Sequence, residues 1–123
     1  MLNVLIADGS PHIRTRLSEL IADMDNVRAV GLAEDGWAAL EAVRQSKPDL
    51  LVIDFHLPGL NGLSLIQAIK QLPTAPVILV LALFSSPMLK QRCLEVGADC
   101  VFEKSLGFEF LSEAIQACAD GLT

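Results

Sequence analysis

No stretch of the sequence is apolar for long enough to cross a lipid bilayer. The longest unbroken apolar run covers residues 77–84, whereas a membrane-spanning helix needs roughly 20 apolar residues. A secretory signal pattern is also missing, because residues 1–6 carry no basic residue and Asp8 follows soon afterwards. We therefore expect no membrane segment and a cytoplasmic location.

Basic residues and cysteines are both scarce. There are 9 lysines and arginines against 15 aspartates and glutamates, a net charge of −6, so we expect no nucleic-acid binding by this domain. Cysteine is limited to Cys93, Cys100 and Cys118, an odd number without metal-like spacing. Their apolar surroundings favour reduced thiols in the core or on helix faces.

Apolar residues are nevertheless abundant, at 52% of the chain. Because no run reaches membrane length, this excess indicates strands that are buried on both faces. Five apolar runs predict strands at residues 3–7, 27–33, 50–54, 77–83 and 100–102. Helical spacing between and after them predicts helices at residues 11–24, 37–46, 62–71, 87–96 and 108–119. Ser10–Pro11 and Ser86–Pro87 are typical helix starts.

Regular alternation of strands and helices with short loops predicts one α/β domain over residues 1–123. The expected architecture is a five-stranded parallel sheet, doubly wound, in the flavodoxin-like order 2-1-3-4-5. In such a sheet the carboxyl ends of the strands share one edge, where ligands bind. That edge should carry Asp8, Asp54 and Lys104. Two carboxylates and an ammonium group suit a hard cation such as Mg²⁺ together with a phosphoryl group.

Four motifs make a family resemblance visible: VLIADGSPHIRTRL, VGLAEDGWAALEAV, PDLLVIDFHLPGLNGLSLI and GADCVFEKS. In this order and at these separations, the chain resembles the receiver domain of two-component response regulators along nearly its whole length. The resemblance implies that Asp54 is the phosphoacceptor and that Lys104 pairs with the phosphoryl group. It further implies Mg²⁺ binding by Asp8, Asp54 and the backbone carbonyl of His56.

Two departures from the family pattern concern the site itself. The second acidic residue of the family falls on Gly9, and the proline after the lysine is replaced by Ser105. Loss of a carboxylate ligand should weaken Mg²⁺ binding by at least the roughly 10–100-fold that more distant changes cost. A cis peptide bond before Ser105 cannot be assumed.

Two further departures concern the family's conformational switch. Its hydroxyl residue falls on Ala82 when counted back from Lys104, or on Leu81 when counted from Pro76, and its aromatic residue falls on Val101. A phosphoryl group would lose a hydrogen bond worth about 1.5–3 kcal/mol. We therefore expect weak switching, unless Ser85 swings in to supply the hydroxyl.

Two functions remain open from the sequence. The first is a phosphorelay receiver, phosphorylated on Asp54 by a sensor histidine kinase or a phosphotransfer protein. It would not be an enzyme beyond self-phosphorylation and autodephosphorylation at Asp54. The alternative is a phosphorylation-independent pseudo-receiver that serves as a protein-interaction module. A haloacid-dehalogenase-type phosphatase is disfavoured because His56 replaces its second aspartate, and a flavodoxin because residues 8–11 lack a phosphate-cradling run.

Aromatic residues suggest a partner surface near the end of the chain. Phe110 falls off the inward stripe of the last helix, and Phe108 lies near that helix's start. The resemblance implies a possible homodimer through the fourth helix, fifth strand and fifth helix. Alternatively, both rings pack under the preceding loop. Trp37 is expected to pack on the second helix.

Overall fold

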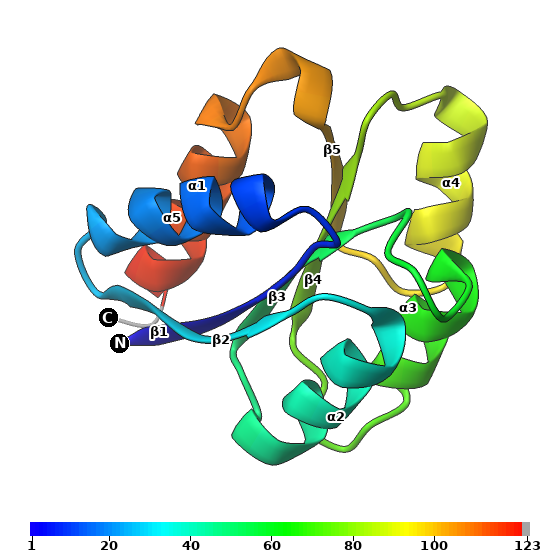
Figure 1. Ribbon diagram of the computed structural model, residues 1–123, viewed down its shortest axis with the longest axis horizontal. Coiled ribbons are helices and arrows are strands. Elements are labelled where there is room, and N and C mark those ends of the chain that lie inside the picture. The colour runs from blue at the N-terminus through cyan, green and yellow to red at the C-terminus, as the bar shows by residue number, and fades with distance from the viewer. Residues whose placement is uncertain (122–123) are drawn as a thin grey trace.

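One parallel sheet organises the chain, and the computed structural model describes residues 1–121 of it (Figure 1). Its order is β2-β1-β3-β4-β5, as the sequence predicted. The strands are β1 (Leu2–Ala7), β2 (Val27–Ala33), β3 (Leu50–Asp54), β4 (Val77–Ala82) and β5 (Cys100–Glu103). The helices are α1 (Pro11–Ala22), α2 (Gly36–Ser46), α3 (Gly62–Lys70), α4 (Pro87–Glu95) and α5 (Glu109–Gly121), with a 3₁₀ turn, η1 (Lys104–Leu106), before α5.

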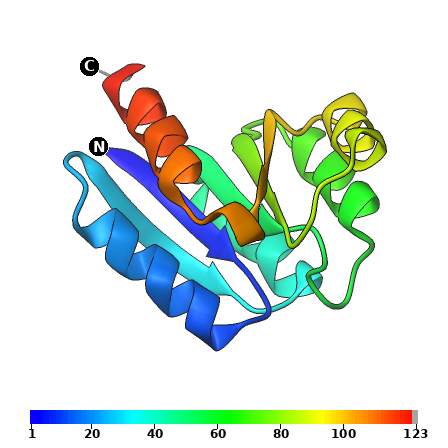
Figure 2. The same cartoon turned by 90° about the horizontal axis from the view of Figure 1, so that it is seen from above.

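Helices cover both faces of the sheet (Figures 1 and 2). On one face, Leu17 of α1 and Leu111 of α5 pack against the sheet, and on the other the cover is formed by α2, α3 and α4. Every residue of β3 is buried, as befits the middle strand. Each fully buried leucine or isoleucine stabilises the fold by about 1.5–3 kcal/mol, so the two layers hold the strand ends in fixed relative positions.

Polar residues cap the helices that begin near the carboxyl edge of the sheet. The Ser10 and Ser86 hydroxyls accept hydrogen bonds from Ile13 N at 3.3 Å and Leu89 N at 3.1 Å, with a proline at the start of each helix. This arrangement confirms the predicted starts of α1 and α4. Each such cap contributes about 1 kcal/mol.

At the amino edge of the sheet, a lysine–aspartate pair links the segments that lead into β4 and β5. Asp99 Oδ2 accepts hydrogen bonds from Ile78 N at 2.8 Å and Lys70 Nζ at 3.0 Å, and Lys70 Nζ also reaches Pro76 O at 2.9 Å. Gly97 has a φ of +119°, and a Cβ there would lie 2.5 Å from Lys70 Cγ. Gly97 and Asp99 therefore allow β4, β5 and α3 to meet at the amino edge of the sheet, away from the carboxyl ends of the strands.

Trp37 was expected to pack on the second helix, but its side chain is 64% exposed. It stands at the start of α2 beside the turn at Gly59, where an added Cβ would lie 3.3 Å from Trp37 Cδ1. The buried positions of α2 are Gly36, Ala39 and Val43, which turns position 37 outward. Within residues 1–121, no helix has the length and apolarity that crossing a membrane requires.

Candidate functional site

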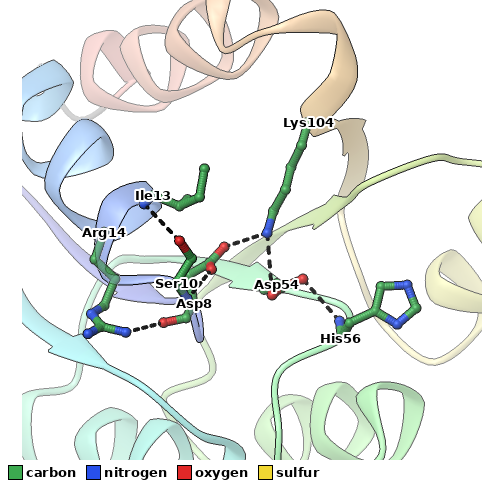
Figure 3. A network of polar contacts seen from close by, with 7 residues as sticks. All are labelled: Asp8, Ser10, Ile13, Arg14, Asp54, His56 and Lys104. Atoms are coloured by element: carbon green, nitrogen blue, oxygen red, sulfur yellow. Dashed lines mark hydrogen bonds and ion pairs between the residues drawn. The ribbon is translucent and has the colours of Figure 1, made fainter.

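Three charged side chains from three strand ends meet at the carboxyl edge of the sheet (Figure 3). Lys104 Nζ lies 2.7 Å from Asp8 Oδ2 and 3.3 Å from Asp54 Oδ2. The strand-end argument expected these residues to be neighbours, and the structure brings them together. The formal charge of the three is −1 − 1 + 1 = −1, so the cluster still favours an added cation.

The Asp8 carboxylate is 1% exposed and is held by the start of α1. Its Oδ1 accepts a hydrogen bond from Ser10 N at 2.9 Å, and its backbone oxygen accepts one from Arg14 Nη1 at 2.7 Å. The contact of Oδ2 with Lys104 is an ion pair by distance, and this oxygen has no well-directed hydrogen bond among the described residues. Asp8 Oδ2 is thus a buried oxygen that faces a cationic group, the Lys104 ammonium.

Asp54 is fixed by the turn that follows β3. Its Oδ1 accepts a hydrogen bond from His56 N at 3.0 Å, while Oδ2 faces Lys104. The turn is tight, since a Cβ on Gly62 would lie 2.6 Å from the backbone oxygen of Phe55. Backbone bonding thus orients the Asp54 carboxylate before any ligand arrives.

The His56 ring takes no part in the cluster. It is exposed and points away from the carboxylates (Figure 3), and its ring centroid lies 5.2 Å from that of Phe55 in an edge-on arrangement. Of His56, the backbone N–H contacts the site through Asp54 Oδ1, and the expected use of its carbonyl as a Mg²⁺ ligand stays a prediction.

Gly9 leaves the cluster short of one acidic side chain. Within residues 1–121, no group of three or more histidine, cysteine, aspartate or glutamate side chains is placed to hold a metal. A Cβ at Gly9 would meet Pro58 Cδ at 3.2 Å, so a side chain there would need a slight shift of the proline. Asp8 and Asp54 remain as the two carboxylates.

The register of the sheet bears on the two positions considered for the missing hydroxyl. Asp54 pairs with Leu81, and side chains of paired residues leave a sheet on the same face. Leu81 belongs to the core layer under α1 and α5, whereas Ala82, also buried, points to the opposite face by alternation. The register therefore favours Leu81 as the position beside Asp54.

The surroundings of this position supply no hydroxyl in its place. The Ser85 hydroxyl donates to Ser86 O at 3.5 Å rather than to Asp54. Val101 is buried in the layer under α2, α3 and α4. The peptide bonds among the described residues are all trans, including the one before Ser105.

Glu103 received no role from the sequence. It is half-buried at the end of β5, and its carboxylate accepts hydrogen bonds from Ser85 N at 2.9 Å and Ser105 Oγ at 3.3 Å. The available signal was a charged residue directly before Lys104 at the end of an apolar strand. Its partner is the backbone amide of Ser85, which the sequence does not distinguish from any other amide.

Comparisons with known proteins agree with this geometry. The family model for the response regulator receiver domain matches residues 4–116, and the chain belongs to this family. A protein-glutamate methylesterase/protein-glutamine glutaminase of Methanospirillum hungatei JF-1 is 35% identical over 115 residues, which cover 92% of this chain and 34% of that protein. Response regulator GacA of Pseudomonas viridiflava is 31% identical over 118 residues, 95% of this chain and 53% of GacA.

Solved receiver structures have the same fold. The signal receiver domain of the response regulator NarL from Mycobacterium tuberculosis has a TM-score of 0.89 at 26% identity, covering 98% of this chain and 97% of that one. A LuxR-family two-component response regulator from Aurantimonas sp. SI85-9A1 has a TM-score of 0.88 at 28% identity, covering 97% and 85%. The chain is therefore a receiver domain of a response regulator, and it spans between a third and about half of the curated relatives described above.

Proposed function

We propose that this receiver accepts a phosphoryl group on Asp54 with the help of Mg²⁺, and that both metal binding and conformational switching are weakened. The donor would be a phosphohistidine of a sensor histidine kinase or phosphotransfer protein, or a small phosphodonor. The observation that supports this most is the Lys104 ammonium, which lies between Asp8 and Asp54 at 2.7 and 3.3 Å.

The proposed reaction is a nucleophilic displacement at phosphorus. A carboxylate oxygen of Asp54 attacks the phosphorus atom, and the bond from phosphorus to the donor breaks. That bond's electron pair leaves with the imidazole, or with acetate when acetyl phosphate is the donor. Lys104 pairs with the phosphoryl oxygens as they arrive, which offsets the repulsion from Asp8. The His56 amide orients the Asp54 carboxylate through its 3.0 Å hydrogen bond.

The residues at the site suit Mg²⁺, although with fewer ligands than the family pattern provides. Asp8 Oδ2 is buried and lacks a hydrogen bond among the described residues, and Asp54 is adjacent. Asp8, Asp54 and the His56 carbonyl would hold the ion, and water would fill the other positions. When bound, Mg²⁺ would neutralise charge that develops on the transferred group. Gly9 limits the affinity because it offers no side-chain oxygen.

Weak switching follows from the residues at the end of β4. Leu81 and Ala82 have no hydroxyl that could donate a hydrogen bond to a phosphoryl group on Asp54. A ligand shifts a conformational equilibrium only by its differential affinity for the two states. Without that hydrogen bond, the phosphoryl group should favour one conformation of the end of β4 over the other only slightly.

Intact-mass measurement after incubation with acetyl phosphate and Mg²⁺ tests the proposal. We expect the wild-type chain to gain one phosphoryl group, Asp54→Asn to gain none, and Asp25→Asn to behave as wild type. Asp25 is the matched control because it is exposed and lies outside the site. Absence of any gain in the wild type would contradict the proposal and support the alternative function, a phosphorylation-independent interaction module.

The exposed apolar residues favour self-association as part of this function. Phe84, Met88, Leu106 and Phe110 are 61–71% exposed on the β4–α4 loop, α4, η1 and α5. A homodimer through α4, β5 and α5 would cover them. The exposure of Phe110 agrees with its expected outward position, whereas Phe108 is half-buried under the Arg16 guanidinium, 4.9 Å from the ring centroid. Light scattering at high concentration should detect a dimer, and a strictly monomeric mass would argue against it.

A further inference from the structure

Glu103 joins two segments that flank the carboxyl edge of the sheet, where Asp8, Asp54 and Lys104 meet. Its Oε1 accepts a hydrogen bond from the amide of Ser85 in the β4–α4 loop at 2.9 Å. Its Oε2 accepts one from the Ser105 hydroxyl in η1 at 3.3 Å. Glu103 also pairs in register with Ala82, the last residue of β4. One carboxylate therefore connects the loop after β4 to the turn that carries Lys104.

The β4–α4 loop, residues 83–86, has few other attachments. The Ser86 hydroxyl caps α4 through Leu89 N at 3.1 Å, and the Ser85 hydroxyl bonds within the loop. Among the described residues, no other hydrogen bond joins this loop to β5 or η1. Phe84, next to Ser85, is 71% exposed. The position of the loop relative to β5 thus depends strongly on Glu103.

Lys104 follows Glu103 directly, and its ammonium is fixed between Asp8 and Asp54. A change at Asp54 that shifts the Lys104 backbone acts directly on Glu103, because the two residues share a peptide bond. Because the Glu103 carboxylate accepts from Ser85 N, that movement reaches the β4–α4 loop through one side chain. This route needs no hydroxyl on β4.

We propose that Glu103 is a positioning residue that couples Lys104 to the β4–α4 loop, in place of a hydroxyl at the end of β4. The inference rests on the proposed function for its signal, because the phosphoryl group on Asp54 is what would displace Lys104. The link itself is a property of the folded chain and is measurable without phosphate.

The first experiment tests the link with hydrogen exchange and amide chemical shifts of Ser85, recorded by NMR. Glu103→Ala removes the acceptor and should speed exchange of the Ser85 amide by about tenfold or more, as expected for a lost hydrogen bond to a charged group. Glu103→Gln keeps one carbonyl acceptor and should restore part of the protection. Glu113→Gln, an equal loss of charge at an exposed site on α5, should leave exchange unchanged.

A double-mutant cycle then separates coupling from local structure. Lys104→Met should shift the Ser85 amide resonance when Glu103 is present and leave it in place in the Glu103→Ala background. A Ser85 resonance that responds equally in both backgrounds, or in neither, would overturn the proposal. The partial rescue by Glu103→Gln keeps the conclusion independent of any loss of stability in Glu103→Ala.

The second experiment adds beryllium fluoride and Mg²⁺ as a phosphoryl mimic. We expect the amides of Lys104 and Ser85 to shift together in the wild type, and only that of Lys104 to shift in Glu103→Ala. A Ser85 shift that persists in Glu103→Ala would overturn the coupling. If neither amide moves in the wild type, the proposed phosphoacceptor function has failed, and the double-mutant cycle alone decides the link.

Discussion

The carboxyl edge of the sheet, where Asp8, Asp54 and Lys104 meet, and the β4–α4 region lie side by side but differ in how far they keep the family's chemistry. At the edge, Lys104 contacts both Asp8 and Asp54, and the departures from the pattern are Gly9 and Ser105. At the end of β4, Leu81 and Ala82 are both buried and apolar, and neither has a hydroxyl. The chemistry that receives a phosphoryl group is therefore more complete than the chemistry that would report it.

This contrast indicates that accepting and relaying a phosphoryl group depend on separable parts of the fold. Acceptance needs charges at strand ends, which the sheet brings together without further adjustment. Relay needs a loop with two conformations, and the phosphoryl group must change the free-energy difference between them. Each substitution below is aimed at one of these two parts.

The largest expected effect comes from removing the charge that joins the strand ends. Lys104→Met leaves the buried Asp8 carboxylate and the nearly buried Asp54 carboxylate without a counter-charge. The free energy of unfolding should fall by about 2–3 kcal/mol, somewhat less than for a fully buried pair. Urea denaturation measures this change, and added Mg²⁺ should recover part of it.

The control for this substitution is Lys90→Met on α4, where the lysine is exposed. Its unfolding free energy should stay within about 0.5 kcal/mol of the wild type. Equal stability of Lys104→Met and wild type would show that the ammonium does not stabilise the two carboxylates. The contrast between the edge and the loop would then lose its basis in charge.

Restoring the missing acidic side chain should complete the edge. Gly9→Asp is expected to tighten Mg²⁺ binding by about 10–100-fold, because it adds a carboxylate beside the other two. Trp37, the single tryptophan, stands beside the turn at Gly59 and is a candidate fluorescence reporter for a Mg²⁺ titration. Gly9→Asn has the same size without the charge and should show little gain. Equal affinities for the two variants would mean that the position does not face the ion.

Restoring the hydroxyl tests the relay and also the register. Leu81→Thr should tighten beryllium fluoride binding about tenfold relative to Leu81→Val, which has the same shape without the hydroxyl. The same comparison at Ala82 should give no difference, because its side chain lies on the other face of the sheet. A gain at Ala82 instead would move the switch position by one residue. Both Leu81 variants should lose about 1–3 kcal/mol of stability through the vacated core volume.

The sequence predicted the fold well because its signals are local. The run at residues 27–33 matches β2 at both ends, and Ser10–Pro11 and Ser86–Pro87 begin α1 and α4 as expected. Strand order then follows from short right-handed connections. The convergence of Asp8, Asp54 and Lys104 was predictable for the same reason, since strand ends of a parallel sheet share an edge.

What the sequence did not predict depends on contacts between distant segments. The link from Glu103 to Ser85 joins a strand end to a loop amide 18 residues away, and any residue type carries such an amide. Trp37 was expected to pack because it is large and apolar, but the inward face of α2 falls on other positions. Counting from Pro76 gives Leu81 and counting from Lys104 gives Ala82, so the sequence could not decide between them. The decision needed the pairing of Asp54 with Leu81 in the sheet.

The smallest expected effect concerns the thiols of α4 and α5. Burial raises the pKa of Cys93, and burial together with the Asp99 charge raises the pKa of Cys118, both from an ordinary value of 9.0. Both thiols should therefore react slowly with a disulfide reagent at neutral pH, since the thiolate is the reactive form. In the unfolded chain they ionise first, so the stability that they contribute is complete below pH 9.0 and falls as the pH rises further.

Cys93 is the fully buried residue of α4 and so reports on movement of that helix. If phosphoryl binding moves α4 only slightly, beryllium fluoride with Mg²⁺ should change the rate of Cys93 modification by about twofold or less. Cys118 on α5 is the internal reference, and single-cysteine variants allow each rate to be followed separately. A much larger acceleration confined to Cys93 would show that α4 does respond. The proposed contrast between acceptance and a weakened relay would then no longer hold, because the movement would extend beyond the β4–α4 loop into α4.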